Sequence, residues 1–292
     1  MRSPVDALQT IGHPFSTMIV ETINGPLYFE LSGDGSPIVF VSGWAMSCEC
    51  WRPVVARLEQ SHRCLIYDAR GIARSQPASI EARFTIEDHA EDLHAVLENA
   101  GVYDALVVGH DVGAAIAARC AQAHPQHVRS LVVVSPRRGL APEDVKSLAV
   151  LTPASLALRE LANYPFIRNL LTRRFRRAPQ PYRDRLFYDF AGLSPRAAYE
   201  TALSASEGES VAALQEFVKR SSSPSLIICG EKDKKGAGEA RRLFAVARAA
   251  KLATIADCGF LPMLEYPGQF AKLLDDFIGD DNADRRSLQN PR

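Results

Sequence analysis

The stretch Leu106-Val-Val-Gly-His-Asp-Val-Gly113 decides the fold of this 292-residue chain. A short apolar strand leads into Gly-x-Asp-x-Gly, and the alanine-rich segment 114–118 that follows is typical of a helix. Gly109 and Gly113 stand at the two positions where a sharp strand-to-helix turn would crowd a Cβ atom. This layout is that of a nucleophile elbow, and it predicts that Asp111 lies at the carboxyl end of a strand and the positive end of a helix.

The composition excludes some classes of partner and of location. The chain has 34 basic and 34 acidic residues, so no net charge favours nucleic acid or an anionic membrane. Its first residues lack a secretory signal, and no apolar run is long enough to cross a bilayer. Six cysteines are scattered, and Cys48 and Cys50 are too close for a zinc knuckle. We expect a cytoplasmic protein with reduced, structural cysteines and a small-molecule substrate or ligand, without cofactor or metal, and we predict no oligomeric state.

Apolar strands alternate with amphipathic helices along most of the chain. Asn24-Gly25 is a strong hairpin signal between two of the strands. The expected strands span residues 17–23, 27–31, 37–41, 63–67, 106–110, 130–135, 225–229 and 252–255, and the expected helices span 51–58, 84–100, 237–250 and 270–278. This order predicts an α/β fold with a mostly parallel sheet that is covered on both faces.

The alternation breaks after Ser135. Residues 139–220 contain helical pieces, tyrosines and prolines but no convincing strand. We therefore expect residues 1–138 and 221–279 to form the core and residues 139–220 to form a helical lid over the carboxyl edge of the sheet. The polar residues 280–292 are expected to be a disordered tail.

Four landmarks together resemble the α/β-hydrolase superfamily over nearly the full chain. They are the elbow, Val41-Ser-Gly-Trp44, Asp68-x-Arg-Gly-x-x-Arg-Ser75 with Ala73 in place of a family glycine, and Gly230-Glu-Lys-Asp233. The elbow is most similar to that of the Asp-nucleophile members, which include epoxide hydrolases and haloalkane dehalogenases. The resemblance implies that Asp111 and Asp233 are catalytic, and that Gly43, Trp44 and Val112 form the oxyanion and binding loop.

The resemblance also implies a histidine after the last strand, and this chain lacks it. Within Cys258-Gly-Phe-Leu-Pro-Met-Leu-Glu-Tyr-Pro267 the frame is intact, but Phe260 takes the histidine position, and the last histidine of the chain is His127. In Asp-nucleophile hydrolases the histidine deprotonates the water that hydrolyses the ester intermediate. With Phe260 in that place, the sequence predicts that an ester on Asp111 would persist.

Three functions remain open at this stage. The leading hypothesis is an enzyme in which Asp111 acts as general acid or base on a small, mostly apolar substrate, in a non-hydrolytic lyase, isomerase or cyclase step. The first alternative is an Asp-nucleophile hydrolase with a replacement base or an engineered Phe260. The second is a non-catalytic module for small-ligand binding or signalling. Burial would raise the pKa of Asp111 and the helix start would lower it, and the sequence leaves this balance open.

Other polar residues receive weaker assignments. Arg137 follows a strand end, so it could contact an anionic or carbonyl-rich substrate or pair with the insertion. We expect His110 to be a packed, hydrogen-bonded residue. The six other histidines are expected at the surface or at helix ends, without a functional role: His13, His62, His89, His94, His124 and His127.

Overall fold

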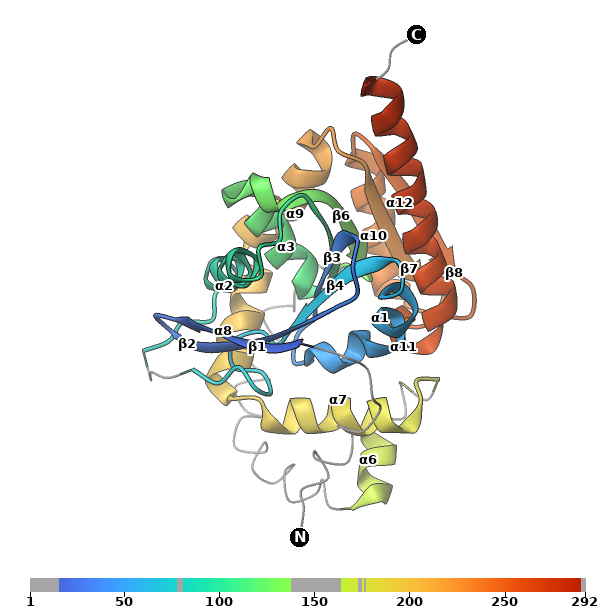
Figure 1. The fold of residues 1–292 in the computed structure, drawn as a ribbon. Coiled ribbons are helices and arrows are strands. Elements are labelled where there is room, and N and C mark those ends of the chain that lie inside the picture. The colour runs from blue at the N-terminus through green and yellow to red at the C-terminus, as the bar shows by residue number, and fades with distance from the viewer. Residues whose placement is uncertain (1–15, 78–80, 138–163, 173–174, 176, 290–292) are drawn as a thin grey trace.

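The chain folds around one eight-stranded sheet with the strand order β1-β2-β4-β3-β5-β6-β7-β8 (Figure 1). The computed structural model describes residues 16–77, 81–137, 164–172, 175 and 177–289. The strands are β1 (Ser16–Thr22), β2 (Gly25–Ser32), β3 (Ser36–Val41), β4 (His62–Tyr67), β5 (Ala105–His110), β6 (Val128–Val134), β7 (Ser225–Gly230) and β8 (Ala250–Ile255).

The sheet is mostly parallel, as predicted. Only the pairs β1·β2 and β2·β4 are antiparallel. The hairpin between β1 and β2 turns at Ile23 and Asn24, and Gly25 pairs with Thr22. Every residue of β5 and β6 is buried, which explains why these central strands read as continuous apolar runs. Successive side chains of a strand point to opposite faces, so Val107 and Val108 belong to two different core clusters.

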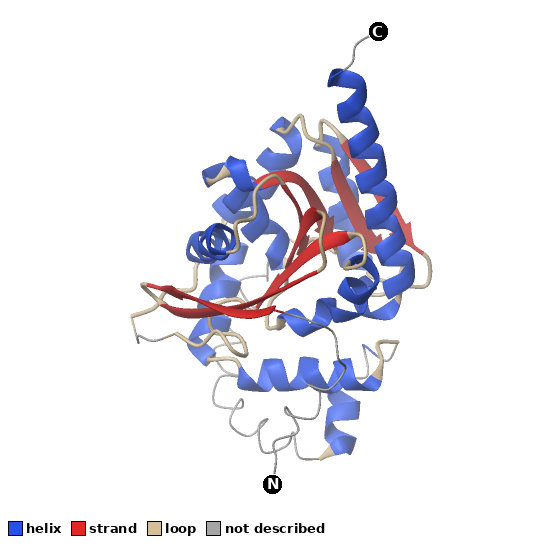
Figure 2. Cartoon of the chain, viewed as in Figure 1, coloured by secondary structure: helices blue, strands red, loops and turns tan. Residues whose placement is uncertain are grey.

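Helices cover both faces of the sheet (Figure 2). They are α1 (Arg52–Leu58), α2 (Ile86–Asn99), α3 (Val112–Ala123), α6 (Pro165–Leu171), α7 (Gln180–Gly192), α8 (Pro195–Ser206), α9 (Gly208–Arg220), α10 (Lys234–Val246), α11 (Pro262–Glu265) and α12 (Pro267–Gln289), with the 3₁₀ turns η2 (Cys48–Trp51) and η3 (Pro125–His127). Helices α2, α3, α9 and α10 contribute to the core on one face, and α1, α11 and α12 to the core on the other. None of the helices in the described ranges combines the length and the apolar character needed to span a membrane.

Helix α2 shows how the sequence sets an element's start. The Thr85 side chain accepts a hydrogen bond from the backbone N–H of Asp88 at 3.1 Å, and the Asp88 carboxylate accepts one from the backbone N–H of Thr85 at 3.1 Å. This capping box satisfies N–H groups that the first helical turn leaves without partners. Leu93 and Leu97, spaced four residues apart, are then buried against the sheet.

The helical segment between β6 and β7 differs from the expected lid at its C-terminal boundary. Helices α6 and α7 lie below the sheet in Figure 1, whereas α9 packs with the core. Leu214 and Val218 of α9 are buried in the same cluster as Val133 of β6. The prediction that the lid extends to residue 220 is therefore wrong, because the amphipathic face of α9 covers the sheet. Residues 139–163 of the expected lid lie outside the described residues.

The C-terminal segment also differs from the prediction. Helix α12 continues through residues 280–289, where the polar composition predicted a disordered tail. Asp281 pairs with Arg129 of β6 at 3.2 Å, and both side chains are buried; Asp280 pairs with Lys251 of β8 at 2.5 Å on the surface. These two ion pairs join α12 to the sheet at residues 280 and 281, a long-range contact that composition does not reveal.

These two neighbouring ion pairs yield a prediction with its own control. The Asp281 side chain is 3% exposed, and Asp281→Ala leaves the buried Arg129 guanidinium without that partner, so we expect a loss of about 3–5 kcal/mol in the free energy of unfolding. Asp280 is 63% exposed, and we expect Asp280→Ala to cost no more than about 1 kcal/mol. Urea unfolding of both variants measures the difference, and equal losses would contradict the docking of α12 through Asp281.

Candidate active site

The turn between β5 and α3 presents Asp111 in a strained backbone conformation. Asp111 has φ 53° and ψ −119°, and it immediately precedes α3. A Cβ atom on Gly109 would lie 2.5 Å from the Cα of Ala114, and one on Gly113 would lie 2.5 Å from the carbonyl oxygen of Val41. Both glycines are therefore required for the chain to turn this sharply, as the sequence indicated. A positive φ outside glycine stores strain, and such strain is concentrated at functional sites.

The Asp111 carboxyl is buried, and opposing effects act on its pKa. Burial raises the pKa above the ordinary aspartate value, and the positive charge of Arg137 lowers it. Hydrogen bonds from the backbone N–H groups of Val112 and Trp44 also lower it, whereas the negative charge of Asp233 raises it. The net shift is upward, which settles the balance that the sequence left open. The donors expected for a substrate oxyanion thus act on the carboxyl group of Asp111 itself.

Arg137 lies between Asp233 and Phe260. Its Nη2 donates a hydrogen bond to Oδ1 of Asp233 at 3.0 Å, and the Asp233 side chain is almost fully buried. The guanidinium carbon lies 4.1 Å from the centroid of the Phe260 ring, within the range of a cation–π contact. The two expectations for Arg137 had been a substrate contact or a salt bridge with the insertion. Its ion-pair partner in the structure is Asp233, which follows β7 in the core and not in the insertion.

The turn that carries Phe260 has the frame that the resemblance implies. The Glu265 carboxylate accepts hydrogen bonds from the backbone N–H groups of Gly259 at 2.8 Å and Leu261 at 3.2 Å. These bonds hold residue 260 between them, and its ring packs against Arg137 and, at 4.5 Å between centroids, against His110. Loops that follow β5, β6, β7 and β8 thus bring Asp111, Arg137, Asp233 and Phe260 to one edge of the sheet.

His110 is buried and hydrogen-bonded, as expected. Its Nε2 lies 2.9 Å from the carbonyl oxygen of Phe260, which can only accept, so Nε2 carries the proton and Nδ1 has a free lone pair. Nδ1 is buried and has no hydrogen-bond partner among the described residues. Burial lowers the pKa of His110 to about 3, so the ring is neutral at physiological pH.

Helices α7 and α8 hold the loop that carries Gly43 and Trp44. The indole N–H of Trp44 donates to the carbonyl oxygen of Ala198 on α8 at 3.1 Å. The backbone N–H and the hydroxyl of Ser47 both donate to Oδ2 of Asp189 on α7, at 2.8 and 2.5 Å. Arg185 binds the other oxygen of Asp189 at 2.7 Å. The Asp189–Ser47 link was missed, because nothing in the sequence signals a contact across 142 residues.

A small pocket, open in part to solvent, lies beside the Trp44 loop. Its lining combines that loop with the start of α3, with α8 and with His89. His89 Nε2 lies 3.1 Å from the hydroxyl of Thr201, and burial lowers the pKa of His89 to about 4. The histidines were expected at the surface or at helix ends. His89 and His127 are buried, but His89 lies in the first turn of α2 and His127 is the last residue of η3. His13 lies outside the described residues.

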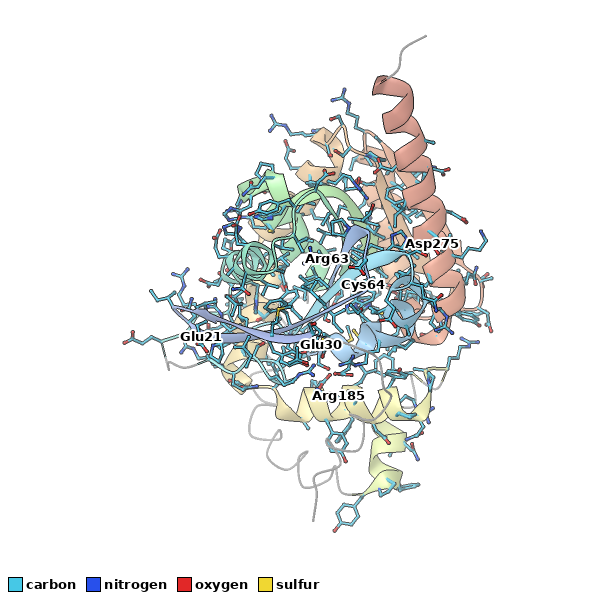
Figure 3. All side chains as sticks on the ribbon, in the orientation of Figure 1. Glu21, Glu30, Arg63, Cys64, Arg185 and Asp275 are labelled. Atoms are coloured by element: carbon cyan, nitrogen blue, oxygen red, sulfur yellow. The ribbon has the colours of Figure 1, made fainter. Side chains whose placement is uncertain are left out.

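A charged network also fills the space between the sheet and α7, in the region where Figure 3 labels Glu30 and Arg185. Arg74 pairs with Asp68 at 2.7 Å and with Glu49 at 3.1 Å. Arg52 pairs with Glu30 at 2.7 Å. This network anchors the Asp68–Ser75 turn that the sequence singled out, and Ala73, which replaces a family glycine, has a positive φ of 42° there.

Comparison with known proteins identifies the family. The profile of the alpha/beta hydrolase fold matches residues 36–267, which is most of the chain. The chain belongs to the α/β-hydrolase fold family. Its structure is similar to an esterase from Exiguobacterium antarcticum, with a TM-score of 0.74 and 16% identity over 90% of this chain and 100% of that one. A bromoperoxidase from Bacillus anthracis gives a TM-score of 0.76 and 18% identity with the same coverage. At these identities the likeness shows the fold alone.

The chain is also similar in sequence to proteins that are named as hydrolases. The chain is 39% identical over 109 residues to "Putative carbamate hydrolase RutD" from Azorhizobium caulinodans, a match that covers 37% of this chain and 40% of the relative. A protein of the same name from Variovorax paradoxus is 36% identical over 113 residues, covering 38% and 42%. The match thus spans about two-fifths of the length of these curated relatives.

These relatives overturn the leading functional hypothesis from the sequence. A non-hydrolytic lyase, isomerase or cyclase step is the wrong expectation, since the matched relatives are named as hydrolases. The expectation rested on Phe260, which takes the position of the histidine that would deprotonate the hydrolytic water. In the structure Arg137 lies against the Phe260 ring and supplies a positive charge next to that carboxyl.

The raised pKa of Asp111 predicts that this residue costs stability at high pH. A carboxyl with a folded pKa above its unfolded value loses stability as the pH rises above that unfolded value, near ~3.9. Asp111→Asn removes the charge and keeps the shape, so we expect a higher melting temperature at pH 8 and a smaller gain at pH 4. Thermal unfolding at both pH values tests this, with the exposed Asp276→Asn as control. A lower melting temperature of Asp111→Asn at pH 8 would contradict the assignment.

Proposed function

We propose that this chain is a hydrolase that adds water directly to the carbonyl carbon of a small substrate, with Asp111 as general base. The observation that carries the proposal is the placement of Arg137, held by Asp233 and Phe260, as the cation that acts on Asp111. Arg137 would meet the negative charge of the substrate.

The protonation states support this division of roles. An arginine stays protonated in proteins, so Arg137 can supply charge but cannot take the place of a histidine as base. Asp111 can accept a proton, and burial raises its pKa, which makes the carboxylate a stronger base. The backbone N–H groups of Val112 and Trp44 already donate to Asp111. Arg137 is therefore the group that would stabilise the negative charge that develops on a substrate oxygen.

Direct attack by water needs no histidine. Asp111 takes a proton from water while the water oxygen bonds to the carbonyl carbon, and the carbonyl oxygen becomes negative beside Arg137. Asp111 then returns the proton to the leaving nitrogen or oxygen as its bond to carbon breaks. No ester forms on the enzyme, so Phe260 blocks no step of this route.

The substrate class follows from the charge of the site and from the relatives. Arg137 favours a substrate with a carboxylate or a strongly polarised carbonyl group. The relatives are named as carbamate hydrolases, and a carbamate combines a carbonyl carbon with a leaving nitrogen. We therefore take a small carbamate as the first candidate, and an ester or amide of similar size as the second.

The unpaired Nδ1 of His110 supports a second candidate route, in which Asp111 is a nucleophile. Nδ1 of His110 is a buried, unpaired lone pair near the elbow, as a Cβ on Gly43 would lie 2.5 Å from it and 3.1 Å from Cβ of Asp111. In an Asp-nucleophile hydrolase, His110 would be the replacement base that activates water against an ester on Asp111. The pKa of about 3 makes His110 a weak base, so we favour the direct route.

The cellular setting belongs to the same proposal. All six cysteines are free and buried, which supports a reducing compartment such as the cytoplasm. We infer that the protein acts on a free small molecule and not on nucleic acid or a membrane, in line with its balanced charge.

Replacement of Arg137 tests the proposed role of its charge. We expect Arg137→Gln to lower kcat/KM for a small carbamate or ester by ~10² or more, the range found when a group that stabilises an oxyanion is removed. Loss of the positive charge raises the pKa of Asp111, so the acid limb of the pH–rate profile moves to higher pH. Steady-state rates between pH 4 and 9 measure both effects.

The control for this experiment is Arg119→Gln, an exposed arginine on α3 that pairs with Glu87 at 3.5 Å. It should leave both the rate and the pH profile unchanged. An acid limb that stays in place in Arg137→Gln would mean that Arg137 does not act on the catalytic carboxyl.

A further inference from the structure

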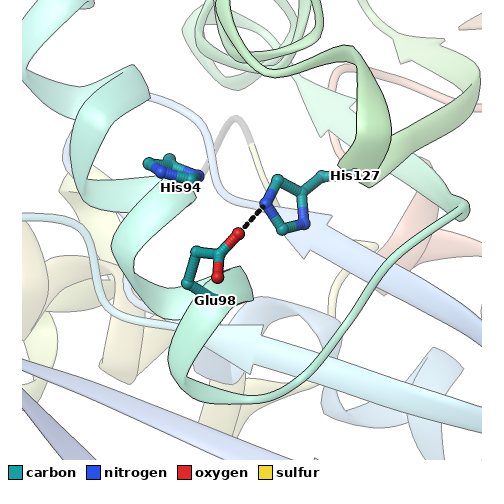
Figure 4. A group of neighbouring side chains, drawn as sticks. All are labelled: His94, Glu98 and His127. Carbon is teal, nitrogen blue, oxygen red and sulfur yellow. Dashed lines mark hydrogen bonds and ion pairs between the residues drawn. The ribbon is translucent and has the colours of Figure 1, made fainter.

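A cluster of histidine and glutamate side chains lies at the amino end of β6, away from Asp111. His94 and Glu98 come from α2, and His127 comes from η3, immediately before β6 (Figure 4). One possible ligand atom from each of the three residues lies within 4.8 Å of the other two. The elbow and Arg137 follow the carboxyl ends of β5 and β6, so this cluster is separate from the proposed active site.

His127 is oriented in the way that metal-binding histidines are. The side chain is fully buried, and its Nδ1 lies 2.6 Å from the carbonyl oxygen of Val102. That oxygen only accepts, so Nδ1 carries a proton and the second ring nitrogen faces the cluster. Nε2 lies 2.8 Å from Oε1 of Glu98, as the dashed line in Figure 4 marks. A lone pair and a carboxylate oxygen this close require either a second proton or a cation between them.

The other two members are also held in place. His94 and Glu98 are four residues apart on α2, which puts them on one helix face. The ring of His94 stacks on His124 at 3.6 Å between centroids and 6° between planes, and the hydroxyl of Tyr103 donates to Oε2 of Glu98 at 3.1 Å. Nδ1 of His94 is buried and makes no hydrogen bond within the described part of the chain.

We propose that His94, Glu98 and His127 bind a divalent transition-metal ion of the zinc class. Two imidazole nitrogens and one carboxylate oxygen are a ligand set suited to Zn²⁺, and three protein ligands leave one position for water. Bonds of about 2.0–2.2 Å require the three atoms to draw together, and the partly exposed Glu98 side chain has room to do so. The ion would tie the end of α2 to the start of β6.

The second group of possible ligands in the described ranges shows the contrast. Glu30, Cys48 and Glu49 also lie within 4.8 Å of one another, but Arg52 and Arg74 already form ion pairs with both glutamates. The positive charge that such a group needs is thus supplied by the protein. At His94, Glu98 and His127 no lysine or arginine of the described residues forms an ion pair with the carboxylate. This site was not predicted from the sequence, because Glu98 and His127 are 29 residues apart along the chain.

Zinc binding to the untagged, full-length protein tests the proposal. After treatment with chelator and removal of the chelator, calorimetry at pH 7.5 should give one Zn²⁺ per chain. Zinc at about 100-fold its Kd should raise the melting temperature by roughly 5–10 °C. Cobalt at the same site should give visible absorption of a four-coordinate ion. Binding should weaken as the pH falls, because protons compete with the ion for its ligands.

Variants locate the ion. Because His127 is buried and its replacement could disturb folding, the deciding variants are His94→Gln and Glu98→Gln, which should each weaken zinc binding at least ~10-fold. The control is His62→Gln, since His62 pairs with Asp275 of α12 at 2.9 Å, outside the cluster. Absence of zinc binding to the wild-type protein would overturn the proposal. So would unchanged affinity in both deciding variants, or an equal loss in His62→Gln.

Discussion

A carboxyl group buried at the tip of the turn between β5 and α3 needs positive charge nearby if it is to ionise, and Arg137 provides it. Among the groups that lower the pKa of Asp111, Arg137 has the largest effect, ahead of the two backbone N–H groups. Asp233 holds the guanidinium by a hydrogen bond and Phe260 packs against it. The three loops after β6, β7 and β8 thus together hold the Arg137 guanidinium near the buried Asp111 carboxyl.

The helices between β6 and β7 extend this constraint to the opposite side of the site. Asp189 of α7 accepts hydrogen bonds from Ser47, and the carbonyl oxygen of Ala198 on α8 accepts one from the Trp44 indole. Trp44 and Ser47 of the Gly43–Ser47 loop are thus each bonded to one of these helices. That loop carries one of the two N–H groups that act on Asp111. Movement of α7 or α8 would therefore change the environment of the carboxyl group as well as access to the pocket.

Local patterns and family resemblance account for the parts of the fold that the sequence predicted. The spacing of Gly109, Asp111 and Gly113 is a local steric requirement, and the structure has the sharp turn that it indicates. The position of Phe260 followed from the intact frame around it, which Glu265 maintains in the structure.

Contacts between segments far apart in the chain could not be predicted from the sequence. The pair Arg137–Asp233 spans 96 residues, and neither segment signals the other. For the same reason the packing of α9 on the core and the docking of Asp281 on Arg129 contradicted predictions that rested on composition. The functional prediction was wrong for a different reason, since it took the loss of the histidine base as evidence against hydrolysis, whereas the matched relatives are named as hydrolases.

Direct attack of water, with Asp111 as base, is the central claim, and isotope labelling tests it most directly. The enzyme would turn over a small ester or carbamate several times in water enriched in ¹⁸O, followed by proteolysis and mass spectrometry of the peptide that contains Asp111. The proposed route forms no bond between Asp111 and the substrate, so the account predicts that this peptide keeps its natural mass. Incorporation of ¹⁸O into the Asp111 carboxyl group would show an ester intermediate on that residue and would contradict it.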